Sequence, residues 1–230
     1  MIAVIGDVHG CFHTLKELVE RIKTNYPVTQ IYCVGDLVDR GKYSFETVDF
    51  VIKEGIITTS GNHDFMFYYS ITDPDNFIGK SWIFNGYEST LASYADKQDR
   101  IVEHLNYIIN MPVFINLSDC FISHAGISSC FKKELSPYPL NDEDKFNQVI
   151  KENINNEHGI IWNREELLDL GKLQLVGHTR QENVNHLKFN NVAYIDTSAY
   201  TGNKLSAVIV DEGKIIDTLS VNTIPIDIEK

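Results

Sequence analysis

Short apolar runs alternate with amphipathic segments over the first sixty residues. The runs 2–5, 31–34 and 56–59 are rich in large apolar residues, many of them β-branched, which predicts three strands. Between them, residues 12–23 and 44–53 carry apolar side chains at helical spacing, which predicts two amphipathic helices. Because strands and helices alternate strictly, we expect right-handed crossover connections and a parallel sheet.

The middle of the chain has a different pattern. Residues 65–110 are rich in aromatic side chains and are predicted to be mostly helical. Runs at 113–115 and 120–123 predict two strands joined by a polar turn. Residues 132–158 are charged, rich in asparagine and interrupted at Pro137-Tyr138-Pro139, so we expect a long surface excursion with one helix.

The last part of the chain consists of short strand patterns. A strand is predicted at 173–176, and four more follow at 184–189, 192–195, 205–210 and 214–219. Turn residues lie between members of this series at Asn190-Asn191 and Glu212-Gly213, which favours an antiparallel meander. A parallel first half and an antiparallel second half predict two sheets, packed face to face and flanked by helices.

Composition and charge narrow the classes of function. The 230 residues include 43% hydrophobic residues, which is enough to bury a core. Lys and Arg number 20 and Asp and Glu number 32, so the formal charge is −12, which argues against a nonspecific nucleic-acid partner. A phosphorylated substrate stays possible if bound cations reverse the local field. The four cysteines form no CxxC pair, so we expect free thiols and a cytoplasmic location. No apolar run approaches the ~20 residues of a membrane-spanning helix, so we expect no membrane partner.

Five polar segments follow predicted strands. They are Gly6–Gly10, Gly35–Gly41, Gly61–Asp64, His124–Gly126 and Gly177–Thr179. In open α/β sheets, ligands bind beyond the carboxyl ends of the strands, so we expect all five segments to meet at one rim. The first three segments are spaced 29 and 26 residues apart (7 to 36, and 36 to 62), which is about one strand–helix–strand unit each.

The side chains of these segments offer carboxylate, carboxamide and imidazole donors. That mixture suits Mn, Fe or Zn better than Ca or Mg alone. Six such ligands and water are more than one ion needs. Two ions about 4 Å apart that share one carboxylate would use all six ligands. Each segment alone is typical of a turn, and the prediction of a metal site rests on their conjunction. The glycines beside the ligands allow the backbone to approach the ions closely.

The ordered motifs GDVHG, GDLVDRG, GNHD, HAG and GHT resemble those of the calcineurin-like metallophosphoesterases. The extended GDLVDRG is most similar to the phosphoprotein phosphatase branch, and within it to the small bacterial and phage Ser/Thr phosphatases. The resemblance runs from Gly6 to Thr179 and includes the final strands. It implies a four-layer αββα sandwich (α/β, or α+β) of two mixed sheets, and one metallophosphoesterase domain over 1–230.

The resemblance also implies a role for each motif residue. Asp7 and His9 would hold the first ion, Asn62, His124 and His178 would hold the second, and Asp36 would bridge the two. His63 would be the general acid, oriented by Asp39. The residues that would bind substrate are Arg40, Arg164 and Tyr200. Two divalent ions are expected, manganese first, with iron or zinc as alternatives. A hydroxide bridging the ions would attack phosphorus directly, so no cysteine nucleophile is needed and Cys11 is only a neighbour.

Two enzymatic interpretations and one other remain open. The first is a phosphatase acting on phosphoserine or phosphothreonine in proteins. The alternative is a symmetrical bis(5'-nucleosyl)-tetraphosphatase, whose group shares GDVHGC, GNHD and HAGI with this chain. Asp39, the Gly177-His178-Thr179 motif and the modest length favour the first, whereas Asp64 in place of Glu departs from eukaryotic protein phosphatases. A catalytically inactive binding module would need a missing ligand, and the sequence lacks none. The oligomeric state is left open.

Overall fold

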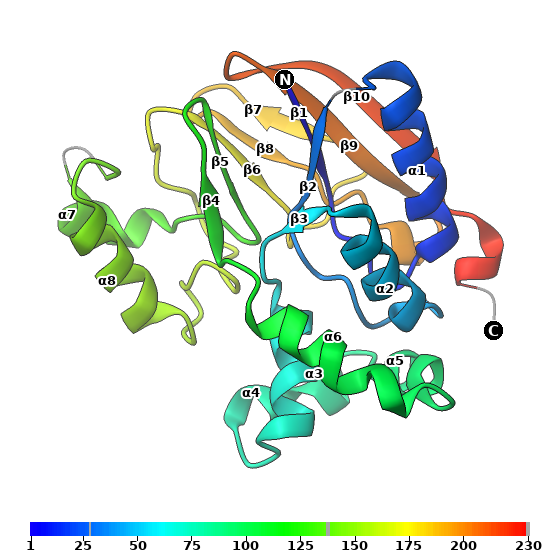
Figure 1. Ribbon diagram of the computed structural model, residues 1–230. Helices are drawn as coiled ribbons and strands as arrows, with labels where there is room; N and C mark the ends of the chain where they lie inside the picture. The colour runs from blue at the N-terminus through cyan, green and yellow to red at the C-terminus, as the bar shows by residue number, and fades with distance from the viewer. Residues whose placement is uncertain (28, 137–138, 229–230) are drawn as a thin grey trace.

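Two five-stranded sheets form the centre of the computed structural model, which describes residues 1–27, 29–136 and 139–228 (Figure 1). The first sheet has the strand order β10-β9-β1-β2-β3. Its strands are β1 (Ile2–Ile5), β2 (Gln30–Cys33), β3 (Ile57–Thr58), β9 (Lys204–Asp211) and β10 (Lys214–Asn222). The first three run parallel, as predicted, and β9 lies antiparallel to β1. This sheet is therefore mixed.

The second sheet has the order β4-β5-β6-β8-β7 and is also mixed. Its strands are β4 (Phe114–Asn116), β5 (Cys120–Ser123), β6 (Leu173–Val176), β7 (Asn185–Leu187) and β8 (Val192–Tyr194). Strands β5, β6 and β8 are parallel neighbours, and β4 and β7 are antiparallel edge strands.

One apolar core fills the space between the sheets, and a second one lies against their outer faces. Because side chains alternate along each strand, successive residues point into one core and then into the other. In β1, Val4 points into the inter-sheet cluster, whereas Ala3 and Ile5 join the cluster outside. In β5, Ile122 faces inward and Phe121 faces outward. The period-2 pattern of each strand thus fixes which face it buries, and the two sheets pack face to face.

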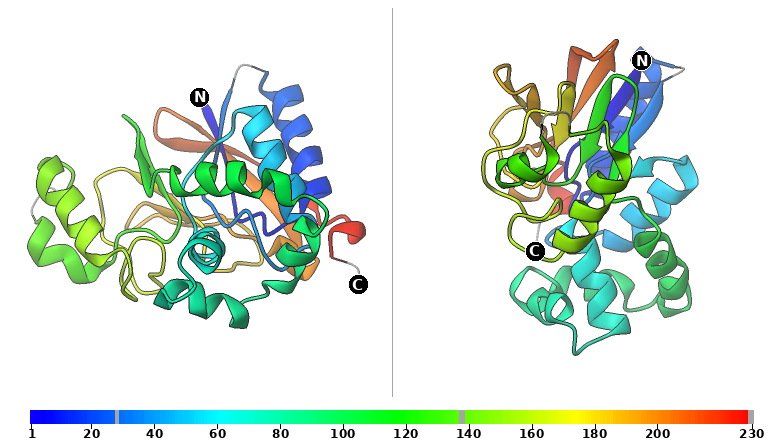
Figure 2. Two further views of the ribbon diagram at one scale, coloured as in Figure 1. Left: turned by 60° about the horizontal axis from the view of Figure 1, so that its bottom comes forward. Right: turned by 90° about the vertical axis from the view of Figure 1, so that its left-hand side faces the viewer.

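Helices cover the outer faces and extend from one end of the sandwich. Their bounds are α1 (Phe12–Asn25), α2 (Ser44–Glu54), α3 (Asn62–Thr72), α4 (Phe77–Ser81), α5 (Glu88–Tyr94), α6 (Ile101–Ile109), α7 (Lys132–Leu135) and α8 (Glu143–Asn153). Helices α1 and α2 lie against the first sheet, α3 to α6 form a helical unit below the sheets, and α8 lies beside β4 (Figure 1). Further views separate the helical unit from the pair α7 and α8 (Figure 2). Helix layers outside two stacked sheets give the expected αββα order.

The start of α1 depends on a residue at the far end of the chain. Cys11 stands at the N-cap position and provides no side-chain cap. The fully buried carboxylate of Asp227 accepts instead, at 3.0 Å from the backbone N of His13 and 2.9 Å from that of Thr14. It also accepts from the Thr14 hydroxyl at 2.6 Å. The acceptor that a local cap would supply is therefore provided by the C-terminal segment.

The prediction that the last four strands form one antiparallel meander is wrong, although the two hairpins within it are present. Strands β7 and β8 pair with one another in the second sheet, and β9 and β10 pair in the first. Strand β9 is buried along six consecutive residues, so it needs partners on both edges, and β1 supplies one of them. The division into a parallel first half and an antiparallel second half is wrong for the same reason, since each sheet takes strands from both halves.

The predicted excursion at 132–158 contains two helices, α7 and α8, rather than one. Helix α8 buries Phe146, Val149 and Ile150, so it contributes to the core as well as to the surface. The Pro137-Tyr138 part of the predicted break lies outside the described residues. In the part of the chain that the structure describes, no helix has the length and apolar character needed to cross a membrane.

Candidate active site

The loops after five strands meet at one rim of the sandwich, as the sequence predicts. Those after β1, β2 and β3 come from the first sheet, and those after β5 and β6 come from the second. Between them lies a cavity of about 180 Å³. Its lining consists of seven predicted residues and two others: Asp7, Asp36, Arg40, Asn62, His63, Arg164 and His178, with Asn85 and Trp162. His9 and His124 are buried beside it.

The backbone is strained where the predicted ligands lie. His9, Asp36, Asp39, Arg40 and His178 all have positive φ angles, between 48° and 72°. L-residues adopt this left-handed region rarely, and each such residue costs roughly 1–3 kcal/mol. Five examples in three loops indicate that the surrounding fold holds these side chains in place for a function.

Two glycines allow the loops to come close to the carboxylates. A Cβ on Gly61 would lie 2.1 Å from Oδ1 of Asp36, and a Cβ on Gly177 would lie 1.9 Å from Oδ1 of Asp7. Neither contact is possible for a real side chain. At these two positions glycine lets the backbone lie against the carboxylates of two predicted ligands, and the expected close approach to the ions themselves stays a prediction.

Backbone carbonyls fix the orientation of three imidazoles. Nδ1 of His9 lies 3.0 Å from the Val38 carbonyl, and Nδ1 of His124 lies 2.9 Å from the Val34 carbonyl. Nε2 of His178 lies 3.2 Å from the carbonyl of Trp162. Since a carbonyl can only accept, each of these nitrogens carries the proton. The opposite nitrogen of each ring is left as a lone pair that faces the rim, which is the arrangement of metal-ligating histidines.

Four lone-pair donors converge on one point beside His124. Its Nε2 lies 3.0 Å from Oδ1 of Asn62, 3.1 Å from Nδ1 of His178 and 3.4 Å from Oδ2 of Asp36. With the imidazole protons turned to the carbonyls, none of these atoms offers a proton to another. Such a convergence is repulsive unless a cation lies among the atoms, so the donor set fits a divalent ion.

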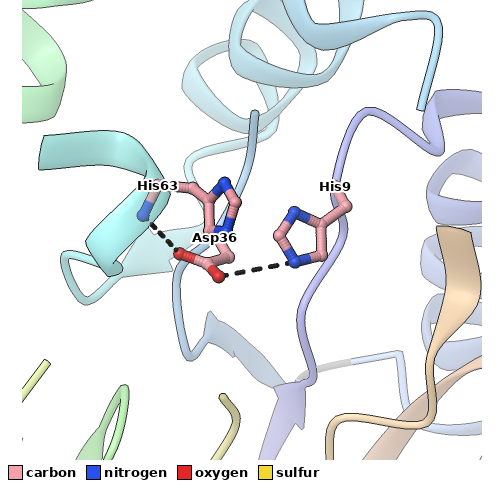
Figure 3. A group of neighbouring side chains, drawn as sticks. All are labelled: His9, Asp36 and His63. Carbon is pink, nitrogen blue, oxygen red and sulfur yellow. Dashed lines mark hydrogen bonds and ion pairs between the residues drawn. The ribbon is translucent and has the colours of Figure 1, made fainter. Parts of the chain in front are cut away.

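A second group of donors shares the same carboxylate. Asp36, His9 and His63 offer ligand atoms that lie within 4.8 Å of one another (Figure 3). Oδ2 of Asp36 is 3.4 Å from Nε2 of His9, and Oδ1 accepts from the backbone N–H of His63 at 3.0 Å. Asp7 lies in the same cavity outside this group, and its carboxylate accepts from the backbone N–H of His178 at 3.0 Å. Two clusters therefore meet at Asp36.

Burial sets the protonation of the predicted ligands. Desolvation lowers the pKa of His9 and of His124 and lowers that of His178 to about 2, so all three rings are neutral near pH 7. Burial also raises the pKa of Asp7, and the charges of Asp196 and Asp36 add to this. Neutral imidazole is the form that binds metal, and a cation beside Asp7 would favour its ionised form.

His63 forms a buried dyad with Asp39. Nδ1 of His63 lies 2.7 Å from Oδ2 of Asp39. The same carboxylate accepts from the indole of Trp82 at 2.9 Å and from the hydroxyl of Thr90 at 2.7 Å. Burial raises the pKa of Asp39, and the bonds from His63, Thr90 and Trp82 oppose that shift. The carboxylate is thus held rigidly, and it fixes the imidazole with Nε2 toward the cavity.

Arg40 contacts two members of one cluster, the group of His9, Asp36 and His63. Its guanidinium nitrogens lie 2.8 Å from Nε2 of His9 and 2.9 Å from Nε2 of His63. The ring of Tyr200 lies under this guanidinium, with 4.4 Å from Cζ of Arg40 to the ring centroid. Arg164 also lines the cavity and donates to the His178 carbonyl at 3.1 Å. The two guanidinium groups therefore flank one small cavity, which suits a phosphoryl group.

Three supporting residues were missed by the sequence reasoning. Trp82 and Thr90 hold Asp39 from the helical unit, and no motif marks either of them. Asp64 belongs to the GNHD motif, where its role could have been sought. Its carboxylate accepts from the backbone N–H groups of Asp36 and Leu37, each at 2.9 Å, and so fixes the loop that carries the shared carboxylate.

Comparison with known proteins identifies the class. The family described as calcineurin-like phosphoesterase matches residues 1–208, and the chain belongs to that family. It is a metal-dependent phosphoesterase family, whose members typically bind two divalent ions, and the two clusters that meet at Asp36 suit them. The recognition of this family from the ordered motifs is thereby confirmed.

Two curated relatives carry the same name. The symmetrical bis(5'-nucleosyl)-tetraphosphatase of Pseudomonas putida (strain GB-1) is 44% identical over 62 residues, which are 26% of this chain and 22% of that protein. The enzyme of the same name from Dechloromonas aromatica (strain RCB) is 30% identical over 125 residues, which are 54% of this chain and 42% of that protein. The chain thus matches between about a fifth and two fifths of the length of these relatives.

Solved structures share the fold. A protein proposed to be a diadenosine tetraphosphatase aligns with a TM-score of 0.62 at 19% identity, over 96% of this chain and 92% of that one. A protein serine/threonine phosphatase from Saccharomyces cerevisiae aligns with a TM-score of 0.60 at 16% identity, over 97% and 80% of the two chains. At these identities the likeness concerns the fold alone, and it confirms the predicted αββα class.

Proposed function

We propose that this protein hydrolyses dinucleoside polyphosphates symmetrically, converting diadenosine tetraphosphate and water to two ADP. The site geometry supports a phosphoester or phosphoanhydride substrate, and the name shared by the curated relatives supports the nucleotide class. This reverses the order of the two interpretations drawn from the motifs. The observation that carries the reaction type is the pair of donor clusters that share Asp36, beside a buried His63–Asp39 dyad.

We assign the ligands as the resemblance implies. Asp7 and His9 hold one ion, Asn62, His124 and His178 hold the other, and Asp36 serves both. The donor set and the fixed ring orientations support this assignment. Manganese is the proposed metal, because mixed oxygen and nitrogen donors without thiolate suit it, and iron or zinc would accept the same set. When bound, such a pair of ions would activate water and neutralise phosphoryl charge.

The chain's own residues perform the remaining tasks. Arg40 and Arg164, which line the same cavity, bind the phosphoryl oxygens, and this binding draws the Arg40 guanidinium away from His9 and His63. The Nε2 of His63 then faces the leaving oxygen and carries the proton to it. Asp39 holds the ring in that orientation and stabilises its charged form. Water attacks phosphorus and loses one proton to solvent, and the bond to the bridging oxygen breaks. The departing ADP takes the proton from His63, which regains one from solvent.

A second candidate is a phosphatase acting on phosphoserine or phosphothreonine. The complete His63–Asp39 dyad favours it, because an alkoxide leaving group needs a strong general acid more than ADP does. The two candidates share the metal ligands and differ in what the walls beyond the phosphate must recognise.

One side-by-side assay separates the two candidates. The enzyme with Mn(II) is given diadenosine tetraphosphate and a phosphothreonine peptide, and the products are identified. We expect two ADP as the products, with a specificity constant for the dinucleotide well above that for the peptide. Dephosphorylation of the peptide with the dinucleotide left intact would contradict the proposal and support the second candidate.

A further inference from the structure

A larger cavity adjoins the proposed catalytic one. It has a volume of about 500 Å³, within the ~300–1,000 Å³ typical of small-molecule sites. The two cavities share Asn85, Trp162 and Arg164 in their walls, so a molecule could extend from one into the other. Any substrate group attached to a phosphate held by Arg164 would meet this space.

Two segments far apart in the sequence form the walls. One wall is α4 and the turn after it, with Phe77, Ile78, Ser81 and Asn85, in the helical unit that Figure 1 shows below the sheets. The opposite wall is the loop 155–165 that follows α8. This loop is tightly built, because a Cβ on its Gly159 would lie 2.2 Å from the Asn153 carbonyl oxygen. The cavity is thus bounded by a fixed loop on one side.

The lining combines aromatic faces with amide and carboxylate groups. Phe77 is 83% exposed although it is a large apolar ring, and the indole N–H of Trp162 is buried without a hydrogen-bond partner among the described residues. The loop wall adds the amide of Asn155, the carboxylates of Glu157 and Glu165, and the imidazole of His158, whose nitrogens lie 3.7 Å and 3.4 Å from those carboxylates. The amide of Asn156 also lines the cavity but is bonded within the loop, to Asn153 and to the backbone N–H of His158. Arg164 is the one arginine or lysine in the lining, and it lies at the junction with the catalytic cavity.

We propose that this cavity is a nucleoside subsite, in which Phe77 stacks on the base of the bound nucleotide. A base offers a flat face to the exposed ring, the amide of Asn155 pairs with its polar edge, and a carboxylate accepts from ribose hydroxyls. Two carboxylates in the lining, Glu157 and Glu165, disfavour further phosphates, so the polyphosphate stays at the arginines. The proposal rests on the proposed function for its reaction, and it names the residues that recognise the nucleoside.

The chain offers a matched control for Phe77. Phe84 is 82% exposed and belongs to the same helical unit, yet it does not line the cavity. Phe77→Ala, Phe77→Trp and Phe84→Ala are compared by kcat and KM on diadenosine tetraphosphate and on p-nitrophenyl phosphate, which has no nucleoside. We expect Phe77→Ala to raise the KM for the dinucleotide about tenfold or more, with p-nitrophenyl phosphate unchanged. Phe77→Trp should restore the KM, and Phe84→Ala should leave both substrates unaffected.

Binding of adenosine and ADP, measured by calorimetry on the same variants, separates this inference from the proposed function. If the wild type fails to cleave the dinucleotide but binds adenosine through Phe77, the function is wrong and the subsite stands. If the dinucleotide is cleaved and Phe77→Ala changes neither its KM nor adenosine binding, the subsite is wrong. A Phe77→Ala effect confined to a phosphothreonine peptide would also overturn it, in favour of peptide recognition.

Discussion

The rim that holds the proposed metal ligands and the larger cavity beside it are built in opposite ways. At the rim, charged and polar side chains are almost completely buried, come from both sheets and are fixed by backbone carbonyls and strained loops. In the adjoining cavity, Phe77 is a large apolar ring left open to solvent, and the walls come from one short helix and one loop.

This difference indicates that the rim performs the chemistry and that the adjoining cavity selects the substrate. A site that binds ions and moves protons needs fixed distances, and burial in two sheets provides them. A wall that selects among substrates changes from one relative to another, and surface loops and short helices tolerate such change. Substitutions at the rim should therefore affect every phosphoester, whereas substitutions in the cavity should affect only some. The following predictions test that distinction.

The largest effect is expected at the shared carboxylate. Asp36→Asn removes the anionic charge common to both clusters. We expect bound metal and activity to fall together, with turnover lost by about a thousandfold or more on all substrates, which corresponds to ~4 kcal/mol of activation free energy. Metal content and kcat are measured on the same preparation. Asp99→Asn, at an exposed position, serves as the control. Full activity of Asp36→Asn with less bound metal would contradict the role of Asp36 as a shared metal ligand.

His63→Asn should lose turnover and keep its metal. The proton donor is removed, so we expect a loss of about a hundred- to ten-thousandfold. Phosphothreonine has a poorer leaving group than p-nitrophenyl phosphate, and the loss should be steeper for it. The readouts are metal content and the ratio of the two losses. Complete loss of metal would show that this imidazole is chiefly a ligand, as its place in the cluster with His9 and Asp36 would allow.

The remote support of α1 should be visible in stability. Asp227→Ala leaves the N–H groups of His13 and Thr14 without their buried acceptor. We expect the free energy of unfolding to fall by about 3 kcal/mol, measured in urea. Asp142→Ala removes an exposed local cap of α8 and should cost only about 1 kcal/mol. Equal costs for the two variants would contradict the role given to Asp227.

Tyr200 lies at the margin of the rim, and its effect should be smaller. Tyr200→Ala removes the ring that lies against the Arg40 guanidinium. Cation–π contacts are worth roughly 0.5–2 kcal/mol, so we expect the KM to rise several-fold, by a similar factor on every substrate. Tyr200→Phe keeps the ring and should be near wild type. An effect confined to one substrate would show that Tyr200 contributes to substrate selection and not to phosphate binding in general.

Cys11→Ser should have the smallest effect. Burial raises the pKa of this thiol, and its Sγ faces the His9 carbonyl. Such a thiol is not a nucleophile. We expect kcat to stay within about twofold of wild type, and loss of turnover in steady-state assays would contradict direct attack by water.

The sequence predicted the rim well because strand ends determine it. Asp7, Asp36 and Asn62 follow successive parallel strands, so their meeting follows from topology alone. The left-handed conformation of Arg40 had no such signal, because glycine, and more weakly Asn, Asp and His, are the residues that favour that conformation.

The parts that were missed depend on long-range pairing. The placement of β9 beside β1 is decided by burial on both of its faces, which local alternation does not reveal. Trp82 supports Asp39 from 43 residues away, and Phe77 faces a loop some eighty residues further on. Neither stands in a motif, since contacts between a helix and a distant loop leave no periodic pattern.

The number and coupling of Mn(II) ions bound per chain test the central claim most directly. Metal analysis of the wild type, together with electron paramagnetic resonance, should give two ions whose spins are coupled through a shared ligand, whereas Asp36→Asn should lose that coupling. One isolated ion in the wild type, with no second binding event as Mn(II) is added, would contradict a centre built on two clusters that meet at Asp36.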